Sequence, residues 1–525
     1  IGQLNARTLA VMAVAACILG GIFCSLSRGA GLAVVGAAIA TVLATLCARG
    51  RRVRLWLVGL VGVAGLGLVG WVGMSGQVQA RFATLLDQEL MAGTRIPHWR
   101  DGLAAAGDFW RLGSGLGTYR YVYRPYQERL SEAWYYHAEN QYLEALVEAG
   151  VPGLGLMLLM IGLVGAAAWR LLTDDEGTAG FAFGVAGVFA LASQAIHGFF
   201  DFGLYVPANV LLFALLSGSV SGRAVDLRSD RSWGRFLSLG RGGLAGPLLA
   251  VLMAGGVLWA CWETRRVAAV ETALRSARFE GPPGEVSAES LTDAIERVAG
   301  SLARRPDDAE ARHGMATLRL HLYRVRAYEQ LQRETGVSGD DPRLWQATSQ
   351  IVLHARAHHF HRNNQPSELE RLRGEPVIEE HLGPSLEQLV LAREACPLLA
   401  EVHVTLGELS AVLVDPAGDG VHIERARRLG PSDLGLLFRC GLLDLQAGRI
   451  GAACESWHAC LSLSDRYLDE VLLLAGRHLS AVRTVEDVLP ESPALLVRLA
   501  RERYQADDQE EIRRLLAERA GRLLD

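Results

Sequence analysis

The sequence predicts an all-α protein in which a membrane domain with several spanning helices precedes a soluble helical domain. Half of the 525 residues are apolar, yet 21% are charged and the mean hydropathy is only +0.19. Almost every long uncharged run lies before residue 263, and almost every charged cluster lies after it. Such a change of composition marks a domain boundary. We therefore assign residues 1–262 to a membrane domain and residues 263–525 to a soluble domain.

The first domain contains seven apolar runs that are long enough to cross a bilayer. A helix needs about 20 apolar residues to span the hydrocarbon layer. Lipid cannot satisfy free backbone groups, so each spanning run is expected to be helical. The runs are residues 8–27, 29–48, 55–74, 151–169, 178–197, 203–222 and 243–262.

Short arginine-rich connections predict how these helices are oriented. Four arginines lie between residues 49 and 54, after the second run, and five lie between residues 223 and 241, after the sixth. By the positive-inside rule both connections are cytoplasmic. The loop of about residues 75–150 and the whole domain after residue 262 are then on the outer side of the membrane.

Charge and cysteine content give no sign of a nucleic acid or metal ligand. The net charge of −5 is spread along the chain and indicates no nucleic-acid partner. All basic residues are arginine, which codon usage explains more simply than phosphate recognition does. The eight cysteines show no paired CxxC spacing, and no Asp-x-Asp motif for a nucleotide sugar occurs. No metal and no cofactor are therefore expected.

Five stretches carry ionisable, amide or glycine residues at the ends of the apolar runs. The most informative is His137–Gly153, because its polar groups come directly before a membrane-length run and place chemistry at the bilayer surface. An arginine at position 28, between two apolar runs, is costly unless it has a function or reaches the interface. The five stretches are Ser25-Leu26-Ser27-Arg28-Gly29, Thr94–Arg100 with Arg95 and Trp99, Gly113–Tyr119, His137–Gly153, and His197-Gly198-Phe199-Phe200-Asp201-Phe202.

In this order, the stretches resemble the signature of the O-antigen ligase and polymerase family over about residues 8–222. The resemblance implies a bacterial inner-membrane enzyme that transfers a glycan from an undecaprenyl-pyrophosphate carrier to an acceptor glycan, lipid or protein at the outer membrane face. Such a transfer needs a base near the acceptor hydroxyl and cations near the leaving pyrophosphate. The predicted catalytic residues are His137, Glu139 and Asn140, and the predicted substrate-binding residues are Arg28, Arg95, Trp99, Tyr119, Arg120, His197 and Asp201.

Two departures from the family pattern leave alternatives open. The family commonly has His directly before the Asn, where this chain has Glu139, so the base is His137, Glu139 or neither. The family usually has more membrane helices than seven, and the chain begins at Ile1 without Met, which predicts an N-terminally truncated sequence. Ligase, polymerase and protein glycosyltransferase activities all fit.

Two other functions are alternatives to glycan transfer. The first is a non-catalytic membrane scaffold in polysaccharide assembly and export, which the Glu139 departure favours and the retained loop motifs disfavour. The second is a transporter, for which charged or broken helices at mid-membrane are expected, whereas the apolar runs here are clean.

The outer loop is also rich in aromatic residues, and Trp134, Tyr135 and Tyr136 are the best examples. Aromatic side chains at this depth usually form a belt at headgroup level. The functional alternative is that aromatic faces bind sugar rings while arginine forks neutralise pyrophosphate.

The soluble half reads as one amphipathic helix after another. Residues Ser301–Ala311 resemble the junction between tetratricopeptide repeats, in which a helix ends and Pro306 starts the next one. Pro397 and Pro431 lie 34 residues apart, which is the period of that repeat. A repeat stack offers a concave surface for a protein or peptide partner or, in secretion machines, for polysaccharide.

Four histidines, His354, His358, His359 and His361, lie close together in this half. Positions 354, 358 and 361 share one helical face, which invites a metal interpretation. No acidic residue is spaced as in a zinc protease motif, so we predict a solvated helical face and no metal site.

Overall fold

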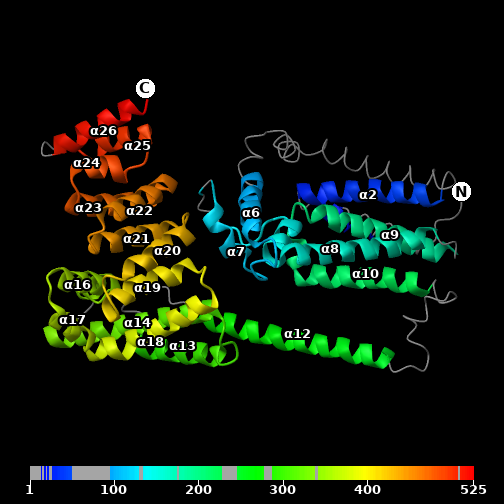
Figure 1. Cartoon of the computed structure of the whole chain (residues 1–525), viewed down its shortest axis with the longest axis horizontal. Coiled ribbons are helices and arrows are strands. Elements are labelled where there is room, and N and C mark those ends of the chain that lie inside the picture. The colour runs from blue at the N-terminus through cyan, green and yellow to red at the C-terminus, as the bar shows by residue number, and fades with distance from the viewer. Residues whose placement is uncertain are drawn as a thin grey trace. The chain divides into compact units, whose positions relative to one another are not determined.

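The computed structural model describes residues 14, 17–18, 20–22, 27–49, 95–128, 130, 134–173, 177–226, 245–276, 286–336, 341–505 and 509–524. Every regular element in these ranges is a helix, which confirms the predicted all-α class (Figure 1). The chain forms two compact units. Unit 1 comprises Ile1–Arg129 with Trp134–Leu249, and unit 2 comprises Leu130–Ala133 with Ala250–Asp525.

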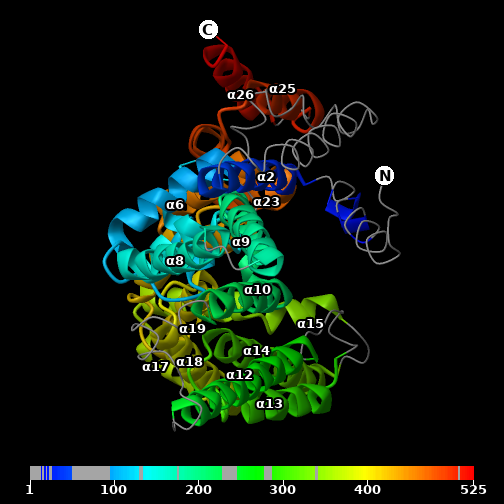
Figure 2. The same cartoon turned by 90° about the vertical axis from the view of Figure 1, so that its right-hand side faces the viewer.

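Unit 1 contains four described helices that are long and apolar enough to cross a membrane. They match the second, fourth, fifth and sixth predicted runs, and Figure 2 shows them from one end. The first run lies mostly, and the third run wholly, outside the described residues, while the seventh falls in α12 (Ala245–Ser276). The four helices are α2 (Arg28–Arg49), α8 (Gln141–Thr173), α9 (Gly177–His197) and α10 (Pro207–Asp226).

Small residues let these helices approach closely. A Cβ atom at Gly36 in α2 would meet the Ile196 side chain of α9 at 2.6 Å. A Cβ atom at Gly187 in α9 would meet Val220 of α10 at 2.9 Å. Small residues at contacts are typical of membrane helices, where packing rather than water exclusion holds the helices together.

The segment that precedes α8 forms a compact polar and aromatic layer beside the ends of the spanning helices. Its elements are α6 (Arg95–Phe109), α7 (Tyr119–Val122) and the 3-10 turn η2 (Arg124–Tyr126), and a further 3-10 turn, η3 (Gly203–Tyr205), connects α9 to α10. Helix α6 packs against α8.

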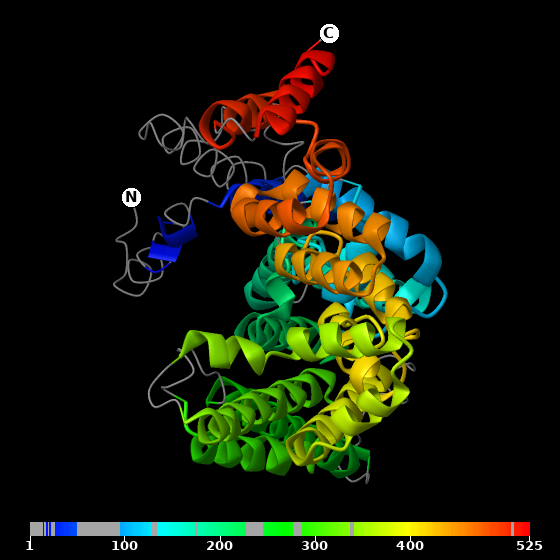
Figure 3. The same cartoon turned by 90° about the vertical axis from the view of Figure 1, so that its left-hand side faces the viewer.

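Unit 2 is a stack of helices, drawn from green to red in Figure 3. Chain neighbours such as α21 and α22 pack on one another, and α14 also packs against α18. Its described helices after α12 are α13 (Ala288–Leu302), α14 (Ala309–Thr335), α15 (Pro342–Ala347), α16 (Gln350–Arg362), α17 (Pro366–Arg373), α18 (Pro376–Ala395), α19 (Ala400–Leu413), α20 (Asp419–Leu429), α21 (Leu434–Gln446), α22 (Ile450–Leu463), η5 (Asp465–Tyr467), α23 (Leu468–His478), α24 (Ala481–Arg483), η6 (Thr484–Val488), α25 (Pro493–Glu502) and α26 (Glu510–Arg522).

Three prolines occupy the same place in this stack. Pro306, Pro397 and Pro431 each lie in a short turn three residues before a helix, namely α14, α19 and α21. The prediction that Pro306 starts the next helix is therefore wrong by three residues. The helix begins later because Asp308 intervenes as its cap, accepting a hydrogen bond from the Ala311 amide at 3.0 Å.

The histidine cluster of α16 differs from its prediction. His359 and His361 are exposed, as expected for a solvated face. His354 and His358 are buried, because α19, α20 and α21 cover that side of α16. The prediction of a solvated face is wrong for these two residues.

Candidate functional site

The segment from His137 to Asn140 is held between α6 and the first turn of α8. The His98 Nε2 atom lies 3.2 Å from the His137 carbonyl oxygen. The Trp99 indole nitrogen donates to the Ala138 carbonyl oxygen at 2.9 Å. The Ala138 amide donates to Glu144 Oε2 at 3.0 Å. Three backbone groups of this short segment are therefore tied to side chains on two helices.

His137 forms a pair with a buried acid. Its Nδ1 atom lies 2.8 Å from Glu144 Oε1, and the His137 side chain is 31% exposed whereas that of Glu144 is 1% exposed. In its ionised form Glu144 only accepts hydrogen bonds, so His137 Nδ1 then carries the proton and donates it. The Nε2 atom then holds the lone pair, which is the form a general base requires.

Two aromatic rings fix the plane of the His137 imidazole. The Phe202 ring stacks on it with centroids 4.4 Å apart, and the Tyr205 ring lies at 4.8 Å. Both residues belong to the connection between α9 and α10. The imidazole is thus oriented from α8 by Glu144 and from this connection by the two rings.

Glu139 is the ion-pair partner of Arg95. The Arg95 Nε atom lies 2.8 Å from Glu139 Oε2, and Arg95 Nη1 donates to the Phe200 carbonyl oxygen at 2.9 Å. Glu139 has a φ angle of 50°, which is rare for a residue other than glycine and persists only where surrounding contacts impose it. The structure therefore places Glu139 on a cation, whereas the buried acid Glu144 contacts His137.

Asn140 caps helix α8. Its Oδ1 atom accepts hydrogen bonds from the amides of Tyr142 and Leu143, both at 3.1 Å. Asparagine is among the preferred residues at such a position because its oxygen satisfies amides that have no partner within the helix. The cap fixes where α8 begins, and therefore where Glu144 lies relative to His137.

Tyr119 lies inside the site rather than on its surface. The residue is fully buried, its hydroxyl lies 3.3 Å from His98 Nε2, and its amide donates to Glu148 Oε1 at 2.9 Å. Burial raises the pKa of the Tyr119 hydroxyl, and the nearby Glu144 charge acts in the same direction. Burial likewise raises the pKa of Tyr123 to about 12 and lowers the pKa of His98. These rings form the neutral core of the layer.

Arg120 belongs to an aromatic group on the outer surface. Its guanidinium carbon lies 4.7 Å from the Tyr121 ring centroid and 5.6 Å from that of Tyr136. The exposed Tyr136 ring stacks on Trp134, whose indole nitrogen donates to the Arg120 carbonyl oxygen at 3.0 Å. A cation between the buried Tyr121 ring and the exposed Tyr136 ring suits both roles predicted for this loop, namely an interfacial belt and a sugar-binding surface.

The motif at the end of α9 borders His137 through its last residue. His197 Nε2 lies 3.5 Å from Asp201 Oδ2, and Asp201 Oδ1 accepts the Phe202 amide at 2.7 Å. Phe202 is the ring that stacks on His137. Gly198 offers its carbonyl oxygen to the Gln141 amide at 2.8 Å, which joins this motif to the start of α8.

Arg28 is the first residue of α2, and its side chain is outside the described part of the structure. Its neighbour Gly29 lies close to the site, since a Cβ atom there would meet the Phe200 Cβ at 3.1 Å. Phe200 is the residue whose carbonyl accepts from Arg95. The backbone at the start of α2 therefore borders the Arg95 region.

The predicted glycine stretch, Gly113–Tyr119, packs against a break in helix α8. Gly150 interrupts α8 with φ 64° and ψ −165°, and the Val151 amide donates to the Trp110 carbonyl at 2.7 Å. The Ser114 amide in turn donates to the Val147 carbonyl at 2.9 Å. A Cβ atom at Gly113 would lie 2.1 Å from the Glu148 carbonyl oxygen, so only glycine fits. The break separates the site-bearing turn of α8 from its apolar part.

An apolar groove lies beside the site in unit 1. It has a volume of about 610 Å³ and is lined by side chains of α8, α9 and α10 with Leu204. Gln141 and Gln194 are among its lining residues, and the Nε2 atom of each is buried without a hydrogen-bond partner among the described residues.

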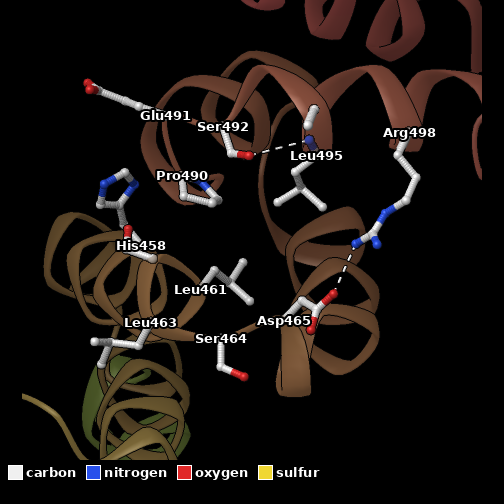
Figure 4. A pocket seen from close by; sticks show the side chains of 12 residues that line it. His458, Leu461, Leu463, Ser464, Asp465, Pro490, Glu491, Ser492, Leu495 and Arg498 are labelled. Carbon is white, nitrogen blue, oxygen red and sulfur yellow. Dashed lines mark hydrogen bonds and ion pairs between the residues drawn. The ribbon is translucent and has the colours of Figure 1, made fainter. Parts of the chain in front are cut away.

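Unit 2 has a groove of its own, of about 650 Å³, between α22 and α25 (Figure 4). Arg498 binds Asp465 at 3.0 Å across one end, and Ser492 caps α25 at the Leu495 amide. None of the predicted site residues lines it.

Four residues near His137 were not predicted as site residues from the sequence. They are Glu144, Glu148, Phe202 and Tyr205. The available signal was Glu144 and Glu148 at a four-residue spacing directly before an apolar run, since two acids on one helix face near lipid need partners.

A comparison with protein-family models matches residues 13–158 to the family described as O-Antigen ligase. No curated protein and no solved structure matches the chain. The matched range includes α2, α6 and the start of α8, and so carries His137, Glu144 and Arg95. The apolar helices and this match indicate an integral membrane protein. Residues 13–158 are therefore similar to the O-antigen ligase family, and this similarity suggests glycan transfer in cell-envelope polysaccharide assembly.

Proposed function

We propose that this protein transfers a glycan from an undecaprenyl-pyrophosphate carrier to a hydroxyl group of an acceptor at the outer face of the bacterial inner membrane. The observation that carries the proposal is the partly exposed His137 held by the buried Glu144 at 2.8 Å. A buried acid that fixes the tautomer of an accessible imidazole is the arrangement used for general-base catalysis.

In the proposed reaction the acceptor oxygen attacks the anomeric carbon of the carrier-linked sugar. His137 Nε2 takes the proton from that hydroxyl while the bond between the anomeric carbon and the phosphate oxygen breaks. The bonding electrons stay on that phosphate oxygen, and the leaving group is the carrier lipid with its pyrophosphate. Glu144 stabilises the imidazolium that forms, because it accepts the hydrogen bond from Nδ1.

Arg95 is the proposed cation for the leaving group. Its Nε and Nη1 atoms are held by Glu139 and Phe200, so the guanidinium has a defined orientation beside the His137 segment. A planar fork suits two phosphate oxygens better than a point charge does. Arg28 and Arg120 are proposed to assist, and Glu139 is proposed to position Arg95 rather than to act as the base.

The apolar groove between α8, α9 and α10 supports a lipid-linked donor. Its lining includes Gln141 and Tyr142, which are the first two residues of α8 and follow directly after the cap Asn140. An apolar groove that ends at polar groups fits a molecule with a hydrocarbon chain and an anionic head. The soluble domain is proposed to lie on the outer side and to bind a protein or peptide partner.

A non-catalytic scaffold in polysaccharide assembly is the second candidate function. The observation that favours it is the Arg95–Glu139 ion pair, because it engages the arginine that would neutralise the pyrophosphate. In a scaffold, the layer around His137 would serve only as a structural cap on the helices.

Glycan transfer in a bacterial strain that lacks its own transferase decides between the two. The complete gene is expressed with His137→Ala, and His361→Ala serves as a matched control because His361 is exposed in unit 2. We expect His137→Ala to lower transfer on the order of 10² to 10⁴-fold at equal membrane levels. If His137→Ala, Glu139→Gln and Arg95→Ala all keep wild-type transfer, the scaffold function holds instead.

A further inference from the structure

Three metal-ligating side chains meet inside unit 2. His354 and His358 lie one helical turn apart on α16, and Asp419 is the first residue of α20. The Nε2 atoms of the two histidines lie 2.8 Å and 2.9 Å from the same atom, Asp419 Oδ2. All three side chains are buried, and the three donor atoms lie within 4.8 Å of one another.

The surroundings of His354 orient its Nε2 atom toward Asp419. Gln446 Oε1 lies 2.9 Å from His354 Nδ1 and accepts a hydrogen bond when that nitrogen carries the proton. Nε2 then carries the lone pair, and a lone pair would repel the carboxylate oxygen that lies 2.8 Å away. A positive charge between the two atoms removes the repulsion. Histidines that ligate metals commonly donate their other nitrogen to an oxygen in this way.

The second oxygen of Asp419 has a partner of its own. Arg449 Nη1 lies 2.8 Å from Asp419 Oδ1, and Arg449 Nε lies 2.6 Å from Asp444 Oδ1. Arg449 Nη2 also approaches Asp419 Oδ2, at 3.2 Å. Arg427 Nη1 also lies 3.9 Å from Asp444 Oδ2, so each of the two carboxylates has a cation beside it. A hydrogen-bonded carboxylate is also the usual state of an acidic metal ligand.

We propose that His354, His358 and Asp419 bind one divalent metal ion of the zinc type. The ion would link α16 to α20. Two imidazoles and one carboxylate are a common ligand set for zinc, and a water molecule would complete the tetrahedron. Metal–ligand distances of about 2.0–2.2 Å require the donor atoms to separate by roughly half an ångström from their present spacing. These residues lie in unit 2, whereas His137 and Arg95 lie in unit 1, so the proposal does not depend on glycan transfer.

Metal binding by the full-length protein tests the proposal. The chain is purified in detergent with an affinity tag that lacks histidine, is stripped with a chelator, and is titrated with Co²⁺ and with Zn²⁺. We expect about one ion per chain, with the visible absorption of tetrahedral Co²⁺, and a higher melting temperature when Zn²⁺ is added. His358→Gln is expected to lose this uptake, and the matched control His361→Gln, exposed on the same helix, is expected to keep it.

Two results would overturn the proposal. One is a wild-type chain that takes up no stoichiometric ion and shows no change in melting temperature with Zn²⁺, a measurement that needs no variant. The other is uptake by His358→Gln that equals uptake by the wild type, since the ion would then lie elsewhere. Should His358→Gln fail to fold, the wild-type titration decides alone.

Discussion

Glu144 uses both carboxylate oxygens on the segment that carries His137. One oxygen accepts from His137 Nδ1 at 2.8 Å and the other accepts from the Ala138 amide at 3.0 Å. The acid therefore fixes both the imidazole tautomer and the backbone that presents it. No sequence motif assigned a role to Glu144.

The first prediction concerns this acid. Glu144→Gln removes the charge that stabilises a protonated His137, so we expect transfer to fall on the order of 10²-fold. The pH dependence of transfer is also expected to change, because the imidazole loses its charged partner, and a merely structural role would not produce that change. Glu128→Gln, at an exposed position of the same layer, is the control. Unchanged transfer and pH profile in Glu144→Gln would refute the assignment.

The second prediction separates the roles of Arg95 and Glu139. Arg95→Lys keeps the charge but loses the bidentate fork. Its transfer rate should therefore be lower than that of the wild type and higher than that of Arg95→Ala. Glu139→Gln should lower transfer less than His137→Ala does, because we expect Glu139 to position Arg95 rather than to take the proton. Initial rates at several donor concentrations measure both effects. A greater loss in Glu139→Gln than in His137→Ala would assign the base to Glu139.

The third prediction concerns the break in α8. Gly150→Ala places a Cβ atom 2.8 Å from backbone atoms of residues 111–113 at a positive φ angle, so we expect a destabilisation of about 2–4 kcal/mol. Gly162→Ala in the same helix has open space around it and is the matched control. Thermal unfolding in detergent measures the difference. Equal melting temperatures for the two variants would show that the clamp at Gly113 and Gly150 adjusts freely.

The fourth prediction is a loss of stability in acid. Burial lowers the pKa of His313 from 6.5 to about 4 in the folded protein, and Arg439 acts in the same direction. The unfolded chain therefore binds more protons between these values, and the stabilisation present above pH 6.5 is lost as the pH falls toward 4. The contribution is about 1–3 kcal/mol. Melting temperatures at several pH values should fall less steeply for His313→Gln than for the wild type, and parallel curves would contradict this.

The fifth prediction is topological. Single cysteines at Leu116 and Asp307 should react with a membrane-impermeant reagent from the outer side, whereas one at Thr173, at the far end of α8, should not. The exposed native cysteines, such as Cys47 and Cys261, are replaced first. Labelling of Leu116 and Asp307 from opposite faces would refute the orientation derived from the arginine-rich connections.

The sequence by itself determined the features that depend on composition and period. The apolar runs near residues 29–48, 151–169, 178–197 and 203–222 became spanning-length helices, because a long apolar run has no other way to satisfy its backbone in lipid. The break between the membrane-like and charged halves was equally visible. His137, Arg95 and Trp99 could be predicted as site residues because each belongs to a local motif with its own spacing.

Only the tertiary structure decided which of these groups meet and which are buried. Glu144 pairs with His137 because the Asn140 cap and the bend before α8 turn the two toward each other. Tyr119 lies in the interior because α6 and α8 close over it. His354 and His358 face Asp419, which is more than sixty residues away in the chain. Contacts between distant residues depend on how helices pack, and local propensity and spacing do not encode that packing.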